Sequence, residues 1–288
     1  MEVLILIHKL FLYNRYKTYI NIYDVMDLHL PTIKIIKMIN KLTQTTAIII
    51  VMQLMVACNS ANQSETSEGK VKTTEVTHEN MHVMTKADQD ALTPESVLNE
   101  FIEGNKRFVS GSVTKREHSE EIRKAVTGGQ FPKAMVLSCL DSRVPVEDVF
   151  DQGLGDVFVG RVAGNFVNID LLGSMEFACK VAGAKLIIVM GHQHCGAIKG
   201  AIDDVHLGNV TAMLTNIKPA VAMSQNFEGE KSSKNDAFVK TVNKNNIRNT
   251  IAQIRAKSEI LKDMESKGEL KIVGAYYSLL TGKLEFVD

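Results

Sequence analysis

Two short segments of the 288-residue sequence hold the side chains best suited to metal chemistry. The first is Cys139-Leu-Asp141-Ser-Arg143, in which a thiol, a carboxylate and a guanidinium alternate. If this segment is extended, the three side chains project to one side, because side chains alternate along a strand with a period of two. The second is His192-Gln-His-Cys195, with an imidazole three residues before another thiol. Two thiolates and one imidazole suit tetrahedral zinc and leave a fourth position for water or a carboxylate.

Each segment follows a short, continuous apolar run, which is typical of a strand buried on both faces of a sheet. One run, over 134–138, leads into Cys139, and another, over 185–190, leads into His192. Similar runs predict three more strands, over 156–162, 271–277 and 284–287. Cys195 then begins a predicted helix, where the backbone dipole favours a thiolate over a thiol.

Helical patterns alternate with these runs. The first begins at Thr93-Pro94-Glu95, with Pro at the first helical position. Further helices are predicted over 115–127, 171–181, 195–202 and 211–223. A longer helix is predicted to stop at Gly268 and to carry a row of apolar residues on one face: Ile247, Ile251, Ile254, Leu261 and Met264. This alternation predicts an α/β fold, with a mostly parallel central β-sheet flanked by helices and an N-terminal helical arm. Ligands of such sheets bind beyond the carboxyl ends of the strands, so the two segments are expected to meet there.

The N-terminal arm is predicted to contribute to assembly. It has no core of its own, and the apolar face of helix 93–109 is therefore expected to dock on a partner subunit.

Taken singly, the candidate residues also allow structural interpretations. A buried Cys at a strand end is usually a packing residue, and an Asp–Arg pair often only supports structure. Cys179, in a predicted helix beside Phe177 and Ala178, is interpreted as such a packing thiol. His194 is either a proton shuttle near the metal or a solvent-facing loop histidine. The second interpretation is favoured, because the sequence identifies no partner for it.

Composition excludes several classes of protein. The chain has 33 basic and 33 acidic side chains, and a net charge of zero excludes a general nucleic-acid binder. Four Cys in a chain of this length are too few for a disulfide scaffold. Apolar residues at 45% and charged residues at 23% are ordinary values for a globular protein.

The front of the chain is expected to direct export. Residues 1–37 show no clean period and are interpreted as a doubtful upstream segment, and residues 38–57 as a signal peptide. Its apolar run of roughly 11 residues rises only ~16 Å, too little to span a bilayer core of ~30 Å. Met55-Val-Ala-Cys58 resembles the lipobox of bacterial lipoproteins, which predicts lipidation of Cys58. Residues 58–87 are expected to form a flexible polar linker, and 88–288 the folded domain. The expected location is the bacterial cell envelope or periplasm, with membrane contact only through a lipid anchor.

The two chemical segments resemble the signatures of the β-class carbonic anhydrases. Gln130-Phe-Pro-Lys-Ala-Met-Val-Leu-Ser-Cys139-Leu-Asp-Ser-Arg143-Val-Pro is similar to the first signature, and Gly191-His-Gln-His-Cys195-Gly-Ala-Ile-Lys-Gly200 to the second. The segment over 151–165 and the helix around 103–108 are also similar to parts of that family.

The resemblance implies roles for individual residues. Cys139, His192 and Cys195 would hold one Zn2+ per subunit. Asp141 would occupy the fourth position in a closed state, or pair with Arg143 in an open one. Gln130 would position the substrate as a further catalytic residue, and Phe158 and Gly196 would line the substrate pocket.

The implied activity is the reversible hydration of carbon dioxide to bicarbonate and a proton, by attack of zinc-bound hydroxide. The implied assembly is a homodimer or a dimer of dimers, with the active site at the subunit interface. Two alternatives remain: a hydrolase of carbonyl sulfide or carbon disulfide on the same zinc site, and a catalytically silent zinc-binding domain. The presence of Asp141, Arg143 and Gln130 together argues against the silent domain, since a structural zinc needs none of them.

One position departs from part of the family. Some members hold a regulatory bicarbonate in a pocket with a Trp three residues before the first Cys ligand, where this chain has Val136. The chain contains no Trp, so the open form of the zinc site is expected at neutral pH, with Arg161 still available to an anion.

Overall fold

The computed structural model describes residues 83–114 and 118–287. The predicted upstream segment, the signal peptide, lipidation of Cys58 and nearly all of the linker lie outside the described residues and stay predictions. The first described helix, α3 (Lys86–Ala91), begins two residues before the expected start of the domain. No helix in the described ranges is long and apolar enough to cross a membrane.

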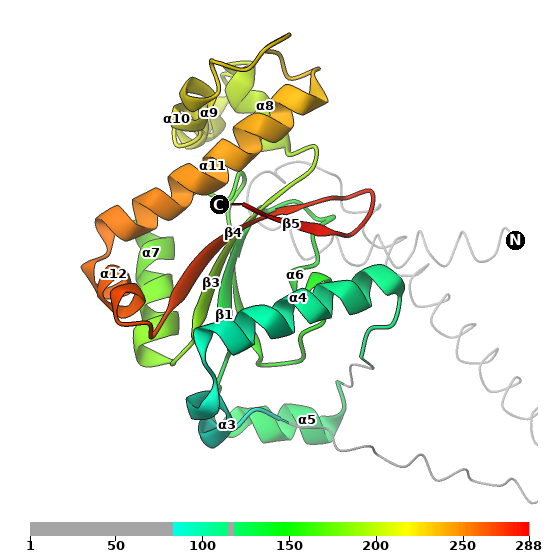
Figure 1. Cartoon of the computed structure of the whole chain (residues 1–288), viewed down its shortest axis with the longest axis vertical. Helices are drawn as coiled ribbons and strands as arrows, with labels where there is room; N and C mark the ends of the chain where they lie inside the picture. The colour runs from blue at the N-terminus through cyan, green and yellow to red at the C-terminus, as the bar shows by residue number, and fades with distance from the viewer. Residues whose placement is uncertain (1–82, 115–117, 288) are drawn as a thin grey trace, which may run out of the picture. The chain divides into compact units, whose positions relative to one another are not determined.

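A five-stranded sheet forms the centre of the domain (Figure 1). Its order is β2-β1-β3-β4-β5; the first four strands are parallel, and β5 runs antiparallel to β4. The bounds are β1 Ala134–Ser138, β2 Val157–Arg161, β3 Leu186–His192, β4 Lys271–Tyr277 and β5 Leu284–Val287. The mostly parallel α/β fold predicted from the apolar runs is therefore confirmed.

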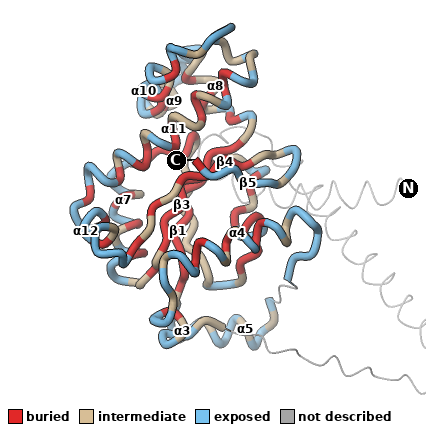
Figure 2. The backbone as a smooth tube through the Cα atoms, in the orientation of Figure 1, coloured by how far each residue is buried: buried red, intermediate tan, exposed pale blue. Residues whose placement is uncertain are grey.

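Helices cover both faces of the sheet. On one face α7 (Ile169–Glu176), α11 (Asp236–Lys257) and α12 (Glu259–Ser266) share a core with inward side chains of β1, β3 and β4. On the other face α4 (Pro94–Ser110) and α6 (Val146–Val149) share a second core with the alternate side chains of the same strands. Because both faces are covered, every residue of β1 and β3 is buried (Figure 2).

The remaining helical segments lie before β1, between α7 and β3, and after β3. They are α5 Glu120–Ala125 with a short 3-10 turn, Val126–Gly128, a π-helical turn Phe177–Val181 after α7, α8 Gly196–Ile202, α9 Gly208–Leu214 and α10 Lys218–Met223. The helices α8 to α10 pack with the first half of α11 in a third apolar cluster that includes Cys139 and Cys195.

Two predicted helices are each divided in the structure. The long helix ends at Lys257 and restarts at Glu259, because the hydroxyl of Ser258 accepts the amide hydrogen of Leu261 and caps α12. The stretch 211–223 forms α9 and α10, separated near Ile217, just before Pro219. Apolar periodicity continues across both breaks, which is why it did not reveal them.

The predicted docking of helix 93–109 on a partner is wrong for its apolar face. Val97, Leu98 and Phe101 of α4 are buried in the domain's own core, and Phe101 contacts the ring of Phe150 at 5.0 Å between centroids. At Gly104 an added Cβ would lie 2.0 Å from the carbonyl oxygen of Phe150, so α4 approaches α6 as closely as backbone allows.

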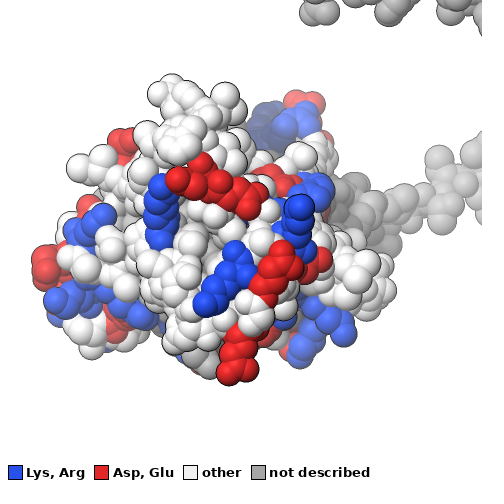
Figure 3. Space-filling view, turned by 90° about the horizontal axis from the view of Figure 1, so that it is seen from above, with Lys and Arg blue, Asp and Glu red and all other residues white. Residues whose placement is uncertain are grey.

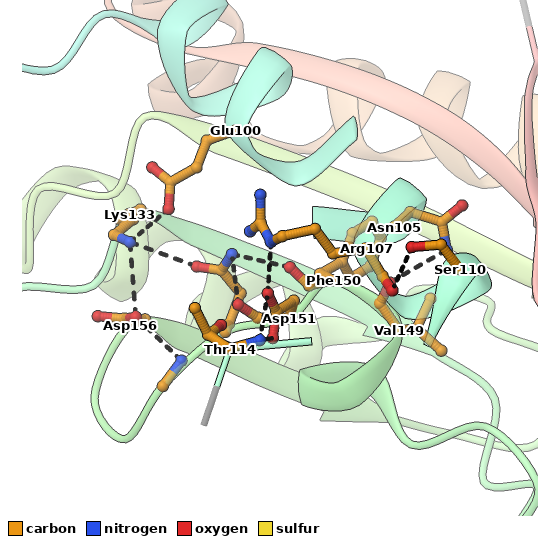
Figure 4. Close-up of polar contacts among 12 residues, drawn as sticks. Glu100, Asn105, Arg107, Ser110, Thr114, Lys133, Val149, Phe150, Asp151 and Asp156 are labelled. Carbon is orange, nitrogen blue, oxygen red and sulfur yellow. Dashed lines mark hydrogen bonds and ion pairs between the residues drawn. The ribbon is translucent and has the colours of Figure 1, made fainter. Parts of the chain in front are cut away.

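Charged side chains fasten α4 to the same domain (Figure 4). Nζ of Lys133, just before β1, lies 2.5 Å from Glu100 and 3.5 Å from Asp156. The buried carboxylate of Asp151 accepts from Arg107 Nε at 2.6 Å and from the Thr114 amide at 3.0 Å. Burial opposes ionisation of Asp151, but these hydrogen bonds prevail and lower its pKa. The arm is therefore an integral part of the fold and holds the segment that leads into β1.

Candidate metal centre

The two predicted segments meet at the carboxyl edge of the sheet. Ser138 of β1 pairs in register with Met190 of β3, so Cys139 follows β1 beside the end of β3, where His192 is the last residue. The chain passes from β1 to β2 on one side and reaches β3 on the other, so the strand order reverses between β1 and β3. Ligand sites of open α/β sheets lie at such a reversal.

Three ligand atoms converge there. The sulfurs of Cys139 and Cys195 and a ring nitrogen of His192 all lie within 4.8 Å of one another, and all three residues are buried. The two sulfurs are 3.8 Å apart. This is the Cys2His donor set that the sequence predicts, and both its residue types and its closeness suit zinc.

The imidazole of His192 is oriented for a metal. Its Nδ1 lies 2.9 Å from the carbonyl oxygen of Gln193, which assigns the ring proton to Nδ1. Its Nε2 is buried and has no hydrogen-bond partner in the described part of the chain. A buried nitrogen with a free lone pair, fixed by a carbonyl on the opposite side of the ring, is the usual arrangement of a zinc-binding histidine.

The electrostatics of the two cysteines also favour a cation. The neighbouring Cys195 thiol lowers the pKa of Cys139 to about 4, against the opposing effect of burial. The same contact, together with burial, raises the pKa of Cys195. Two thiolates at this distance repel each other, so one sulfur ionises at the other's expense, and a divalent cation removes that repulsion. Cys195 is the N-cap of α8, where the amides of Ala197 and Ile198 also favour its thiolate.

The carboxylate of Asp141 is turned toward Arg143. Arg143 donates from Nε to Oδ1 at 2.9 Å and from a terminal nitrogen to Oδ2 at 2.7 Å, and its backbone amide also donates to Oδ1. These hydrogen bonds hold the pKa of Asp141 well below its usual range. Oδ2 is still only 3.8 Å from Nε2 of His192. Asp141 is therefore an ionised hydrogen-bond acceptor at the rim of the metal cluster.

Arg161, the last residue of β2, supports this loop from behind. Its guanidinium donates to the carbonyl oxygens of Cys139 at 3.1 Å, Asp141 at 3.3 Å and Val144. These hydrogen bonds hold the loop that carries Cys139 and Asp141, and the availability of Arg161 to an anion stays a prediction. Val136, three residues before Cys139, is fully buried in the sheet core.

Of the other predicted site residues, Gln130 and Phe158 lie away from the cluster within one chain, whereas Gly196 lies next to it. Gln130 is exposed and precedes β1, whereas Cys139 follows it, so the five residues of β1, about 17 Å, separate them. Phe158 is half-buried near the amino end of β2, opposite Met135. Gly196 directly follows Cys195 as the first residue of α8, and an added Cβ there would meet nothing within 4 Å.

Two residues close to the centre have partners that the sequence did not reveal. His194 is exposed, as the favoured interpretation expects, but its Nδ1 lies 3.3 Å from a carboxylate oxygen of Asp236. Asn243 of α11 donates to the carbonyl oxygen of His192 at 2.9 Å. A polar residue on the buried face of an amphipathic helix was the available signal for Asn243. Cys179 is a buried free thiol whose pKa burial raises to about 12, so its interpretation as a packing residue is confirmed.

Fold and site together define a class of protein: an α/β metalloprotein with two thiolates and one imidazole at the carboxyl edge of its sheet, and an acid–arginine pair beside them. Catalytic zinc sites have this form, with three protein ligands and an open fourth position.

Comparison with known proteins gives the family. A family model described as carbonic anhydrase matches residues 134–284. The chain is 35% identical over 191 residues to carbonic anhydrase 2 of Mycobacterium tuberculosis, covering 65% of this chain and 89% of the relative. It is also 35% identical over 190 residues to a carbonic anhydrase of Mycolicibacterium smegmatis, covering 64% and 88%.

Solved structures agree. The β-carbonic anhydrase CafA of Aspergillus fumigatus matches with a TM-score of 0.52 at 26% identity, over 58% of this chain and 81% of that chain. A tetrameric β-carbonic anhydrase of Sordaria macrospora has the same fold, with a TM-score of 0.52 at 22% identity over 58% and 85% of the two chains. The chain therefore belongs to the carbonic anhydrase family and to its β class, whose members are zinc-dependent lyases.

Proposed function

We propose that this chain hydrates carbon dioxide reversibly to bicarbonate and a proton at the centre formed by Cys139, His192 and Cys195. The observation that carries the proposal is the convergence of these three ligand atoms within 4.8 Å, with the nearby Asp141 carboxylate engaged by Arg143. An Asp141 bound to Arg143 leaves the fourth metal position to water, which supports the open form expected from the sequence.

A zinc ion held by these ligands would lower the pKa of a coordinated water from 15.7 to about 7 and so supply hydroxide at neutral pH. Neighbouring groups of the chain hold the ligand side chains in the form that binds a metal. The Gln193 carbonyl fixes the tautomer of His192, and the amides at the start of α8 favour the Cys195 thiolate.

Asp141 would act as the hydrogen-bond acceptor beside the open position. Arg143 keeps its carboxylate ionised, so Asp141 can accept a hydrogen bond from the attacking oxygen and hold a lone pair of that oxygen toward carbon dioxide. Arg161 would keep the loop that carries Cys139 and Asp141 in place. Acidic and basic side chains are interspersed on the face shown in Figure 3.

Stopped-flow measurement of proton release from carbon dioxide on the zinc-loaded protein tests this proposal. Catalysed release is expected at about pH 8, where most metal-bound water is ionised. Hydrogen sulfide release from carbonyl sulfide, without carbon dioxide hydration, would instead favour the hydrolase alternative. Absence of both activities at full zinc occupancy would identify a silent zinc-binding domain.

A homodimer is proposed as the complete form of the site. The edge strand β2 is half-buried along its whole length, although its apolar run predicts burial on both faces. Beside it lies a hollow of about 550 Å³ lined by Met135, Phe158, Leu171 and Phe177, with Phe177 49% exposed. A second copy packed on this edge would cover the apolar surface and bring its own Gln130 and Phe158 toward this chain's metal cluster.

Mixing two inactive variants tests that arrangement. Gln130→Ala and Cys139→Ser each impair every site of their own homodimer, but a mixed dimer regains one site with an intact metal cluster and the Gln130 of the other subunit. Coexpression at equal amounts should restore about a quarter of wild-type activity, from the statistical share of mixed dimers. Activity no higher than the sum of the two homodimers would contradict the shared site, as would a fully active Gln130→Ala variant.

Export and lipid attachment at Cys58 are proposed from the sequence pattern alone. The mature protein should then begin at an acylated Cys58, and the mass of its N-terminal peptide measures this. An unmodified Cys58 inside a longer mature chain would refute the lipoprotein assignment.

A further inference from the structure

Two buried asparagines on α11 contact the loops that carry the metal ligands. Asn243 and Asn246 are fully buried and three residues apart, so they lie on one face of the helix. The surrounding positions on this face, such as Val242 and Ile247, are apolar core residues. Two amides in such a setting need an explanation, because burial of a polar side chain is unfavourable unless its hydrogen bonds are provided.

Asn243 acts on the His192 side of the centre. Its Nδ2 donates to the backbone carbonyl oxygen of His192 at 2.9 Å, while the imidazole of the same residue is fixed by Gln193. Gly191 makes room for this contact: an added Cβ there would lie 2.0 Å from Oδ1 of Asn243. The chain therefore brings α11 directly against the strand residue that precedes a metal ligand.

Asn246 acts on the Cys139 side. Its Nδ2 donates to the carbonyl oxygen of Gly164 at 2.7 Å. The amide of Gly164 in turn lies 3.3 Å from the sulfur of Cys139 and donates to it. The next residue, Asn165, has a left-handed backbone (φ 42°), and its carbonyl oxygen accepts from the Thr250 hydroxyl one turn further along α11. This loop is thus held in an uncommon conformation by the same helix face.

We infer that Asn243 and Asn246 are positioning residues of the zinc centre, through which α11 sets the relative placement of His192 and Cys139. In the described part of the chain, the oxygen of each amide has no hydrogen-bond partner. The hydrogen bond that each side chain makes there is the one its nitrogen donates to a carbonyl oxygen near the centre. Neither residue touches the metal position. The inference rests on the proposed ligands, Cys139 and His192.

Zinc affinity of the full chain, measured by competition with a chelator, tests the inference. Asn243→Ala and Asn246→Ala should each weaken zinc binding about 10- to 100-fold, the usual effect of removing a group that orients a metal ligand. The Co2+-substituted variants should also show shifted thiolate and ligand-field absorption bands, because the ligand geometry changes. The matched control is Asn245→Ala on the same helix, whose amide donates to Ser224 instead, and it should keep wild-type affinity and spectrum.

A purely structural role predicts a different pattern. The asparagine variants would then unfold at lower temperature but, well below that temperature, bind zinc within twofold of wild type with an unchanged Co2+ spectrum, and this result would overturn the inference. If Asn243→Ala does not fold, Asn246→Ala tests the same point on the Cys139 side. Cys139→Ser distinguishes failure of the ligand assignment from failure of the positioning role. Retention of zinc by Cys139→Ser would refute the ligand assignment. Loss of zinc from Cys139→Ser, together with unchanged zinc binding in both asparagine variants, would refute only the positioning role.

Discussion

Replacement of Cys139 by Ser should remove both zinc and activity. A serine hydroxyl is not ionised near neutral pH and is a poor zinc ligand, so the buried site keeps only His192 and Cys195 of its three convergent groups. Without the metal, the pKa of water returns from about 7 to 15.7. We therefore expect carbon dioxide hydration to fall at least ~1,000-fold, and the zinc content of the purified protein to fall with it.

Cys179→Ser provides the matched comparison for this change. Cys179 is equally buried, but it lies in the π-helical turn after α7, in the core on one face of the sheet, and has no part in the metal cluster. It should lose some stability by placing a hydroxyl among apolar groups, and keep one zinc per chain with full activity per zinc. Zinc measured by mass spectrometry and initial rates from the same samples compare the two variants. A Cys139→Ser protein that still holds zinc would exclude this cysteine as a ligand.

The convergence of the candidate ligands could be predicted because two of them lie at the ends of local apolar patterns. Cys139 directly follows the apolar strand β1 and His192 is the last residue of the apolar strand β3, and parallel strands bring such positions to one edge of the sheet. The residue types at those positions then indicate the metal. The prediction that the two segments meet needs only one piece of long-range information, namely that β1 and β3 are neighbours in the sheet.

Contacts between distant segments could not be predicted in the same way. Asn243 is 51 residues from the carbonyl that it binds, and Arg161 is 22 residues from Cys139. Their hydrogen bonds depend on where α11 and β2 pack, which no local pattern records. The half-buried state of β2 has a similar cause, since its apolar run matches that of an interior strand but its place at the edge is a property of the whole sheet.

Breaks inside regular patterns were also hidden. The apolar face from Ile247 to Met264 continues through Ser258, although the backbone leaves the helix there to let that serine cap α12. A serine can be recognised in the sequence as a helix N-cap only if the end of the preceding helix is also marked, and no Gly or Pro marks the end of α11. The apolar face of α4 shows the reverse case, because a stripe that suggests a partner surface is used by the chain's own core.

Asp141→Asn should lower activity strongly while leaving zinc in place. The variant keeps the size of the side chain but replaces the carboxylate, which Arg143 keeps ionised, by a neutral amide. Because one oxygen becomes an NH2 donor, the side chain can no longer accept hydrogen bonds from both Arg143 and the attacking oxygen as the carboxylate does. Loss of a positioned acceptor beside the reacting group typically reduces the rate by ~100-fold or more. We expect kcat/KM to fall by about that factor, with zinc content unchanged, because Cys139, His192 and Cys195 remain.

The pH profile and a matched variant show whether this loss reflects chemistry. Because the pKa of Asp141 lies well below its usual range, its carboxylate is ionised throughout the neutral range. The wild-type rise in kcat/KM with pH therefore reports water at the metal, with a midpoint near ~7, and should persist at a lower level in Asp141→Asn. Asp263→Asn breaks an exposed pair with Lys267 on α12 and should leave the profile and the rate unchanged. Equal activity of Asp141→Asn and wild type would show that the acid–arginine pair only braces the loop, and zinc loss in Asp141→Asn would instead show that this carboxylate belongs to the ligand set.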